Sequence, residues 1–241
     1  MSNNTPVKTI VVTGASSGIG RACALHFAGL GFTVFAGVRR EEDARALESV
    51  APENLVPIHL DVTSPSMIET ARVEVTEKLT GNGLTGLINN AGIALGGPLE
   101  FLSLSDFRHE IEVNLIGVVA VTQAFLPLIR HGNGRIVNIG SMSGFIALPF
   151  IGPYAATKFA LRAINDSLRL ELRPWGISVS IVEIGDVDTK IWDKSLAFIE
   201  KVAKELPQRG WELYGPVLKI RERFQPHGMA PLMWFASLEM Q

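Results

Sequence analysis

The sequence predicts an α/β domain in which a parallel β-sheet is covered by helices on both faces. Six short runs rich in β-branched residues alternate with longer segments of helical periodicity, which is typical of βαβ units. Several of the short runs are apolar throughout, as expected of strands buried on both faces. The 241 residues are 47% hydrophobic and 19% charged, and no linker-like segment interrupts the first 189, so a single domain over 1–241 is expected.

The elements are expected in strict alternation along the chain. The predicted strands are Lys8–Val12, Thr33–Ala36, Leu55–His59, Gly86–Ile88, Arg135–Ile139 and Ser178–Val182. The predicted helices between them are Gly18–Leu30, Glu41–Ser49, Ser64–Leu79, Ser105–Arg130 and Pro153–Leu172. Because each helix connects two strands of one sheet, the strands are expected to run parallel.

Composition limits the classes of function. A net charge of −2 gives no electrostatic case for binding nucleic acid or an anionic membrane. The single cysteine permits no internal disulfide, which fits a reducing compartment. The polar opening MSNNTPVK is not typical of a signal peptide, and no window reaches the roughly 18 uninterrupted apolar residues of a membrane span. A cytoplasmic protein without a membrane span is therefore expected.

The first predicted strand runs directly into the turn TGASSGIG, residues 13–20, and then into a helix. Such a junction brings free backbone N–H groups and a positive dipole end to a bound diphosphate. Gly14 permits the turn, Gly18 lets the backbone approach the phosphates, and Gly20 lets the helix pack close to the sheet. The spacing GxxxGxG matches the dinucleotide-binding fingerprint only loosely, so an ordinary glycine-rich turn remains an alternative at this point.

The end of the second strand distinguishes the two nicotinamide cofactors. NAD sites usually place a carboxylate there for the ribose 2′-hydroxyl, whereas an arginine accommodates the 2′-phosphate of NADP. The sequence FAGVRR places Val38, Arg39 and Arg40 at this position, with no acid before Glu41. Arginine pairs with a phosphate that a carboxylate would repel, and Ser16 can add a hydroxyl. NADP(H) is therefore expected to be preferred, with NAD(H) possible; the alternative is that both arginines only solvate a loop.

The stretch YAATK, residues 154–158, places Tyr154 and Lys158 four residues apart on one face of a predicted helix. On its own this is equally explained by a chance pair on a solvated face. A charge about 5 Å from the phenol, at an effective dielectric constant of about 20, is worth about 3 kcal/mol. That would lower the pKa of Tyr154 from about 10 toward 8, so that the phenol can pass a proton at neutral pH.

Further motifs follow the later strands: NNAG (89–92) after the fourth, Ser141 in NIGSMSG after the fifth, and Asn114 in the helix between them. Together with TGASSGIG and YAATK, they closely resemble the short-chain dehydrogenase/reductase family over about residues 7–189. The segment VFAGVRREEDARAL is similar to the branch that contains hydroxysteroid and retinol dehydrogenases, which handle bulky apolar alcohols and ketones. The resemblance implies a doubly wound Rossmann fold with a parallel sheet of order 3-2-1-4-5-6.

The resemblance also implies a role for each matching residue. Tyr154 is the acid/base, Lys158 tunes Tyr154 and binds ribose hydroxyls, Ser141 orients the substrate oxygen, and Asn114 holds a water that relays protons. Asp61, in LDV, contacts the adenine ring. The full expected cofactor site comprises Gly14, Ser16, Ser17, Gly18, Ile19, Gly20, Arg39, Arg40, Asp61, Val62, Asn90, Ala91, Gly92, Tyr154, Lys158, Gly185, Val187 and Thr189. No metal site is expected.

Two segments depart from the family's pattern. The family usually has proline and glycine after the sixth strand, whereas IGDVDT (184–189) has Ile184 in the proline position, so a looser nicotinamide pocket is expected. Residues 190–225 are apolar and aromatic and are expected to form a mobile substrate lid, although packing on the body or on a partner subunit is equally consistent. Met229–Met240 is typical of a short apolar helix, so a seventh strand is not expected and this helix should cover the edge strand.

The predicted function is that of an NADP(H)-dependent oxidoreductase that interconverts a ketone or aldehyde and an alcohol on an apolar, steroid-, retinoid- or lipid-like substrate. A non-catalytic NADP-binding regulatory protein is one alternative, favoured by Ile184 and opposed by the intact set Asn114, Ser141, Tyr154 and Lys158. An enoyl reductase or sugar-nucleotide epimerase is another. A homodimer formed through the two long central helices is expected.

Overall fold

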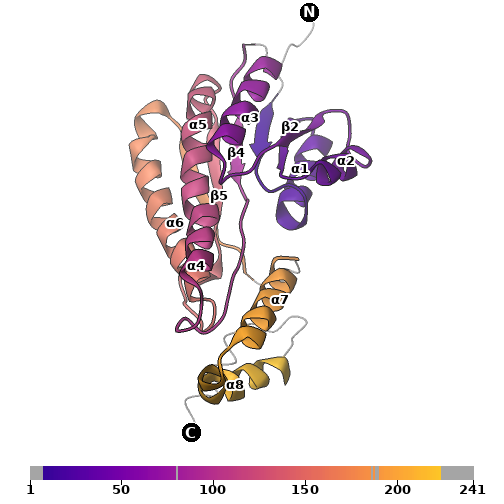
Figure 1. Ribbon diagram of the computed structural model, residues 1–241. Coiled ribbons are helices and arrows are strands. Elements are labelled where there is room, and N and C mark those ends of the chain that lie inside the picture. The colour runs from indigo at the N-terminus through magenta and orange to yellow at the C-terminus, as the bar shows by residue number, and fades with distance from the viewer. Residues whose placement is uncertain (1–7, 80, 186, 188–189, 224–241) are drawn as a thin grey trace, which may run out of the picture.

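A computed structural model describes residues 8–79, 81–185, 187 and 190–223, and it shows a parallel sheet between two layers of helices (Figure 1). The strands are β1 (Thr9–Val12), β2 (Thr33–Val38), β3 (Leu55–His59), β4 (Gly86–Asn89), β5 (Arg135–Ile139) and β6 (Ser178–Val182). They pair in the order β3-β2-β1-β4-β5-β6, and every pair is parallel. The expected sheet order is confirmed, and the bounds of β3, β5 and β6 are those predicted from the sequence.

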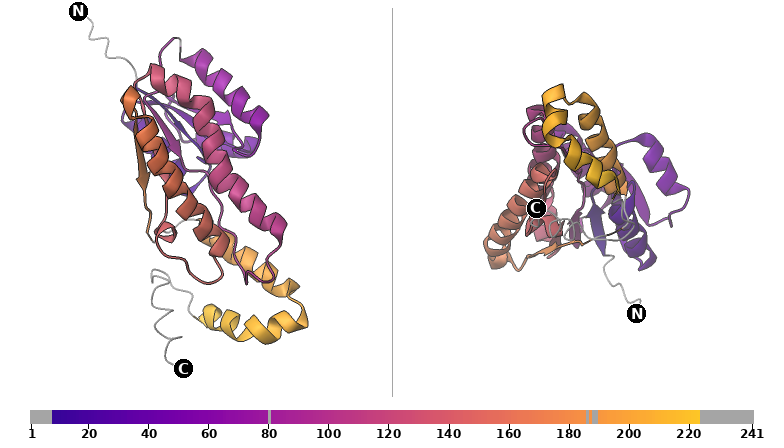
Figure 2. Two further views of the ribbon diagram at one scale, coloured as in Figure 1. Left: turned by 90° about the vertical axis from the view of Figure 1, so that its left-hand side faces the viewer. Right: turned by 90° about the horizontal axis from the view of Figure 1, so that it is seen from below.

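The helices follow the strands in turn. They are α1 (Gly18–Gly29), α2 (Glu41–Glu48), α3 (Pro65–Lys78), α4 (Leu104–Ile111), α5 (Gly117–His131), α6 (Gly152–Glu171), α7 (Lys190–Glu205) and α8 (Gln208–Arg223). Three short turns join them: η1 (Glu112–Ile116), η2 (Met142–Gly144) and η3 (Arg173–Trp175). Helices α3, α5 and α6 lie on one face of the sheet, and α1 and α2 lie on the other (Figures 1 and 2).

The central strands contribute side chains to two separate hydrophobic cores, one on each face of the sheet. Val11 and Leu87 point toward α3 and α5, where Phe125 is fully buried. Their neighbour Val12 points to the opposite face and packs with Leu47 of α2. Because successive side chains of a strand point to opposite faces, a sheet covered on both faces needs apolar residues at nearly every strand position. This explains the apolar runs that predicted the fold.

The single helix predicted at Ser105–Arg130 is interrupted. A π-helical turn, η1, separates α4 from α5 and contains Asn114; such turns are frequently found at functional sites. The segment Leu104–His131, with a mean hydropathy of 1.7 in its most apolar window, is long and apolar enough to cross a membrane on composition alone, although core helices meet the same criterion. In this fold its residue Val121 has no exposed surface, because α5 packs against β4 and α3.

Helices α7 and α8 follow β6 and lie beyond the carboxyl ends of the strands (Figure 1). Ile199 of α7, Leu218 of α8 and Leu206 in the connection between them form a small core with Phe101 and Phe150 of the main body. Both helices lie in the segment 190–225 that was expected to form the substrate lid. The apolar helix expected at Met229–Met240, and the question of a seventh strand, fall in residues 224–241, outside the described residues.

Candidate active site

The candidate site lies at the carboxyl ends of β1, β4, β5 and β6. The strand order reverses between β1 and β4, since β2 and β3 extend to one side of β1 and β5 and β6 to the other. Open parallel sheets bind their ligands outside the carboxyl ends of the strands at such a point. The glycine-rich turn, NNAG and Ser141 follow these strand ends, whereas the two arginines and Asp61 follow β2 and β3.

The turn between β1 and α1 is held against the end of β4. Asn90 Nδ2 donates to the carbonyl oxygens of Thr13 (2.9 Å) and Gly14 (3.0 Å), and Thr13 Oγ1 accepts the N–H groups of Asn90 and Ala91. Gly14 has a φ of +65°, which favours glycine. A Cβ on Gly20 would overlap Gly14 O and Asn90 Nδ2. The close helix packing expected of Gly20 is therefore present, and the turn keeps a fixed shape.

The N-terminus of α1 fits a dinucleotide diphosphate. Helix α1 begins at Gly18, its first turn contains no acidic residue, and Ser17 makes no capping hydrogen bond through its side chain. The first N–H groups of a helix have no partner within the helix, and the dipole there is positive. The residues present thus suit an anion, and Ser16 to Gly20 would hold it.

The two arginines after β2 differ in their surroundings. Arg40 is ion-paired with Glu42 (2.7 Å) and with Asp43 (2.9 Å). Arg39 is exposed and makes no ion pair with any residue that the structure describes. Burial opposes ionisation of Asp61, but two hydrogen bonds from Thr63 and the nearby charge of Arg39 outweigh it and lower the pKa of Asp61. Arg39 therefore lies near the expected adenosine pocket with its guanidinium available, whereas Arg40 is already engaged.

The structure brings three of the expected catalytic residues into one buried cluster. Ser141 follows β5 and caps η2, where its Oγ accepts the Ser143 N–H (3.1 Å). Tyr154 and Lys158 lie on consecutive turns of α6, and Lys158 Nζ is 5.6 Å from the centre of the Tyr154 ring. Lys158 Nζ also donates to the carbonyl oxygen of Ile139 (2.7 Å), at the end of β5. This hydrogen bond holds the lysine ammonium next to the tyrosine ring.

The predicted lowering of the Tyr154 pKa is absent in this structure. Burial is the largest effect and raises the pKa of Tyr154; a hydrogen bond with Ser141 lowers it, and the charges of Glu110 and Glu183 raise it. Burial also lowers the pKa of Lys158 to about 8, against the opposing charges of Glu183 and Glu110. The prediction counted the charge of the lysine but neglected the desolvation of both groups, which disfavours tyrosinate and ammonium alike.

Asn114 uses its side chain to hold the loop after β4. Its Oδ1 accepts the Ile93 N–H (2.9 Å), and its Nδ2 donates to Ile93 O (2.8 Å) and to Thr157 Oγ1 (3.2 Å). Both N–H groups of the amide are therefore engaged, and the side chain links the loop to α6. The expected water relay stays a prediction.

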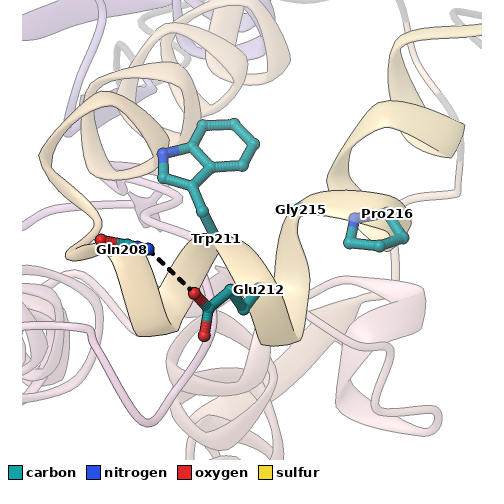
Figure 3. Close-up of a pocket in the computed structure, with 5 residues that line it drawn as sticks. All are labelled: Gln208, Trp211, Glu212, Gly215 and Pro216. Carbon is teal, nitrogen blue, oxygen red and sulfur yellow. Dashed lines mark hydrogen bonds between the residues drawn. The ribbon is translucent and has the colours of Figure 1, made fainter.

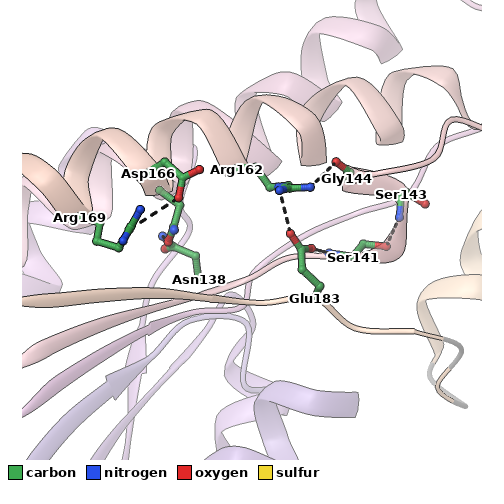
Figure 4. Close-up of polar contacts among 9 residues, drawn as sticks. Asn138, Ser141, Ser143, Gly144, Arg162, Asp166, Arg169 and Glu183 are labelled. Atoms are coloured by element: carbon green, nitrogen blue, oxygen red, sulfur yellow. Dashed lines mark hydrogen bonds and ion pairs between the residues drawn. The ribbon is translucent and has the colours of Figure 1, made fainter.

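Two acids that sequence reasoning missed lie at the site: Glu110, which is buried, and Glu183, which is partly buried. Glu183 follows β6; its Oε2 accepts the Ser141 N–H (2.7 Å), and its Oε1 lies 3.6 Å from Arg162 Nε (Figure 4). Glu110 is on α4, one helical turn before Asn114, and has no exposed surface. Neither belongs to a motif that was singled out. Glu183 stands directly after the strand Ser178–Val182, whereas Glu110 lies among charged residues and had no sequence signal.

The segment after β6 keeps its place without the usual proline. The N–H of Met142 donates to the carbonyl oxygen of Ile184 (2.9 Å), so the chain continues beside the loop that carries Ser141. Gly185 and Val187 are exposed, and Thr189 lies outside the described residues. The looser nicotinamide pocket expected from Ile184 stays a prediction.

Helix α7, which follows β6, reaches Tyr154. The ring of Trp192, in α7, meets the ring of Tyr154 edge to face, with centroids 5.9 Å apart. Ala94 and Ile151 are buried in the same cluster. Further out, Tyr214 of α8 donates to Glu100 (3.0 Å). The surface next to Tyr154 is therefore apolar and aromatic.

A hollow of about 590 Å³ lies elsewhere, on α8 (Figure 3). Its lining residues, Gln208, Trp211, Glu212, Gly215 and Pro216, all belong to that one helix. A single helix cannot enclose a ligand, so this hollow is not the active site. Within the described residues, no group of three or more His, Cys, Asp or Glu side chains is placed to hold a metal ion.

Comparison with known proteins gives consistent matches. A family model described as short chain dehydrogenase matches residues 8–199. Estradiol 17-beta-dehydrogenase 2 of Mus musculus is 42% identical over 196 residues, which are 78% of this chain and 51% of that protein. Mitochondrial D-beta-hydroxybutyrate dehydrogenase of Rattus norvegicus is 40% identical over 218 residues, which are 86% of this chain and 64% of that protein. The chain therefore spans about half to two-thirds of the length of these relatives.

Among solved structures, the closed form of serine dehydrogenase complexed with NADP+ matches with a TM-score of 0.74 and 29% identity. The match covers 86% of this chain and 81% of that one.

Proposed function

The chain belongs to the short-chain dehydrogenase/reductase family, and we propose that it is an NADP(H)-dependent oxidoreductase that interconverts a ketone or aldehyde and an alcohol. The observation that carries this proposal is the buried cluster of Ser141, Tyr154 and Lys158 at the carboxyl ends of β5 and β6, with exposed fractions of only 7%, 5% and 7%. Three polar side chains in one nearly dry site are difficult to explain by stability, since burying each of them opposes folding.

Each of these residues has a separate role in the proposed reaction. Tyr154 donates its phenolic proton to the substrate oxygen in reduction and accepts it in oxidation. Ser141, whose backbone is anchored by Glu183, donates a hydrogen bond that orients the same oxygen. A bound nicotinamide cofactor supplies or accepts the hydride. Lys158, when charged, stabilises the tyrosinate left after proton transfer and binds ribose hydroxyls.

The preference for NADP(H) is supported by the end of β2. Arg39 offers an unengaged guanidinium there, and no carboxylate occupies the position used for a ribose 2′-hydroxyl. The matched solved structure holds NADP+. With NADPH as the reductant, reduction of the carbonyl is the proposed direction.

An apolar substrate is supported by the surface around Tyr154. Trp192, Ile191 and Leu148 pack around the tyrosine with Ala94 and Ile151. A substrate that reaches the phenol must replace or line these contacts. One relative is named for estradiol, an apolar steroid, and a steroid-, retinoid- or lipid-like substrate is proposed here.

A cytoplasmic homodimer is proposed as the state in which the protein works. Apolar residues stay exposed in η1 and α6: Ile116 of η1 is 46% exposed, and Phe159 and Leu170 of α6 are 45% and 62% exposed. A second copy packed against these helices would bury them.

The test is a turnover screen. The purified protein is incubated with a panel of apolar ketones and secondary alcohols, each with NADPH or NADH, or with the oxidised forms, while absorbance of the reduced nicotinamide is followed. The proposal expects turnover of at least one apolar substrate, faster with the phosphorylated cofactor. Tight NADPH binding without turnover of any panel member would favour the non-catalytic alternative.

A further inference from the structure

Glu110 is a buried acid that the proposed chemistry does not use. It lies on α4 with no exposed surface, and its Oε1 accepts the Leu95 N–H (2.9 Å). Its Oε2 has no hydrogen-bond partner among the described residues. A carboxylate with a bare buried oxygen is strongly disfavoured, so its presence calls for a nearby charge or a bound proton.

The surroundings of Glu110 connect it to the catalytic helix. Asn114, one turn later on the same face, holds Ile93, so the two side chains together fix the loop after β4. Helix α4 packs against α6, which carries Tyr154 and Lys158. The positive charge of Lys158, on α6, lowers the pKa of Glu110. The negative charge of Glu110 in turn raises the pKa values of Lys158 and Tyr154.

We propose that Glu110 is a positioning residue for proton transfer: the charge on its buried carboxyl keeps Lys158 cationic, and thereby sets the proton affinity of the Tyr154–Lys158 pair. The expected effect of Glu110 on turnover rests on the proposed function. The electrostatic link between Glu110 and Lys158 stands apart from it and is measurable in the protein alone.

The charges around the lysine support this assignment. Lys158 is nearly fully buried, and within the described residues its one hydrogen-bond partner is the neutral carbonyl of Ile139. Burial lowers the pKa of Lys158 to about 8, and the two charges that oppose burial are Glu183 and Glu110. Glu183 is held by Ser141 and lies near Arg162, which offsets part of its charge. Glu110 has no such cationic partner besides Lys158 within the described residues.

Glu110 itself changes charge near neutrality. Burial raises its pKa to about 7, against the hydrogen bond from Leu95 and the charge of Lys158, which lower it. Below neutral pH the carboxyl takes up a proton and its effect on Lys158 ends. The pH dependence of turnover should therefore show an additional ionisation, that of Glu110 on α4, besides those of the tyrosine and the lysine.

The test compares Glu110→Gln with Glu112→Gln. The first replacement preserves the shape and the acceptor for the Leu95 N–H and removes only the charge. The second removes an exposed carboxylate two residues away on the same helical segment. The pKa of Lys158 is measured by NMR of its side-chain Nζ and Cε, assigned with Lys158→Arg, in the protein without cofactor or substrate.

The expected result is that Glu110→Gln lowers the pKa of Lys158 by about one pH unit, because removing a buried negative charge disfavours the ammonium form. Glu112→Gln should leave it unchanged. In alcohol oxidation, the lower apparent pKa of the kcat profile should fall by the same amount in Glu110→Gln only. An unchanged Lys158 pKa in a folded Glu110→Gln variant would overturn the proposal.

If Glu110→Gln does not fold, the same coupling is measured from the side of Lys158. Coupling between two sites is equal in both directions, so Lys158→Met should raise the pKa of Glu110, read from its carboxyl carbon, by the amount that Glu110→Gln lowers that of Lys158. No change at Glu110 would contradict the inference. If Lys158 titrates as expected but no panel substrate is turned over, the proposed function fails and the electrostatic link stands.

Discussion

Replacing Arg39 with alanine tests the cofactor preference at its source. Arg39 is exposed and makes no ion pair within the described residues, whereas Arg40 is bound by Glu42 at 2.7 Å and Asp43 at 2.9 Å. A charge-assisted hydrogen bond to a phosphate is worth about 1.5–3 kcal/mol, or roughly 10- to 150-fold in affinity. Because solvent screens an exposed guanidinium, we expect the lower part of that range, about 10- to 30-fold.

The assay is kcat/KM for NADPH and for NADH with one ketone from the screen, supported by direct cofactor binding. Arg39→Ala should reduce the NADPH-to-NADH ratio by that factor and leave NADH nearly unaffected. The matched control is Arg40→Ala, which should change the ratio by less than about threefold, since its ion pairs must first be broken. Equal kcat/KM for the two cofactors in the parent protein, or a ratio that survives Arg39→Ala, would refute the assignment.

Three further outcomes are expected. Lys158→Ala should lower turnover and weaken cofactor binding together; an unchanged cofactor Kd in a binding titration would contradict the ribose role. The free energy of unfolding in urea is compared between the parent and Glu110→Gln, and the parent's value relative to the variant should fall by about 3 kcal/mol as pH rises from about 4.5 to 7. The reason is that a raised carboxyl pKa makes the folded state bind the proton more tightly than the unfolded state. A difference in unfolding free energy that does not vary with pH would contradict that pKa. Light scattering should give a dimer mass for the parent and a monomer mass for Phe159→Glu, and a stable tetramer would show that the dimer proposal is wrong.

The sheet was predictable because its signal is local. Apolar β-branched runs such as Arg135–Ile139 and Ser178–Val182 have the bounds read from the sequence. The turn at Gly14 and Gly20 was predictable for a similar reason, since few residue types tolerate that backbone and that close approach. The alternation of strands and helices then left few ways to arrange them.

Other features depend on contacts that no short window of sequence contains. The π-helical turn at Asn114 interrupts a run with unbroken helical periodicity, and it accompanies the hydrogen bonds of Asn114 to Ile93. The effects of Glu110 and Glu183 on Lys158 arise only after α4, α6 and β6 are brought together. The prediction that Lys158 lowers the pKa of Tyr154 failed because desolvation is a property of the packed structure.

The proton-transfer role of Tyr154 is the central claim, and Tyr154→Phe tests it most directly. The variant removes one hydroxyl from a ring that stays packed against Trp192, so cofactor binding should survive. Turnover and NADPH affinity are measured side by side on the best substrate of the screen. A loss of at least about a thousandfold in kcat, with the cofactor Kd within about threefold of the parent, is predicted for a group that acts only in the transition state. Activity within tenfold of the parent would contradict it.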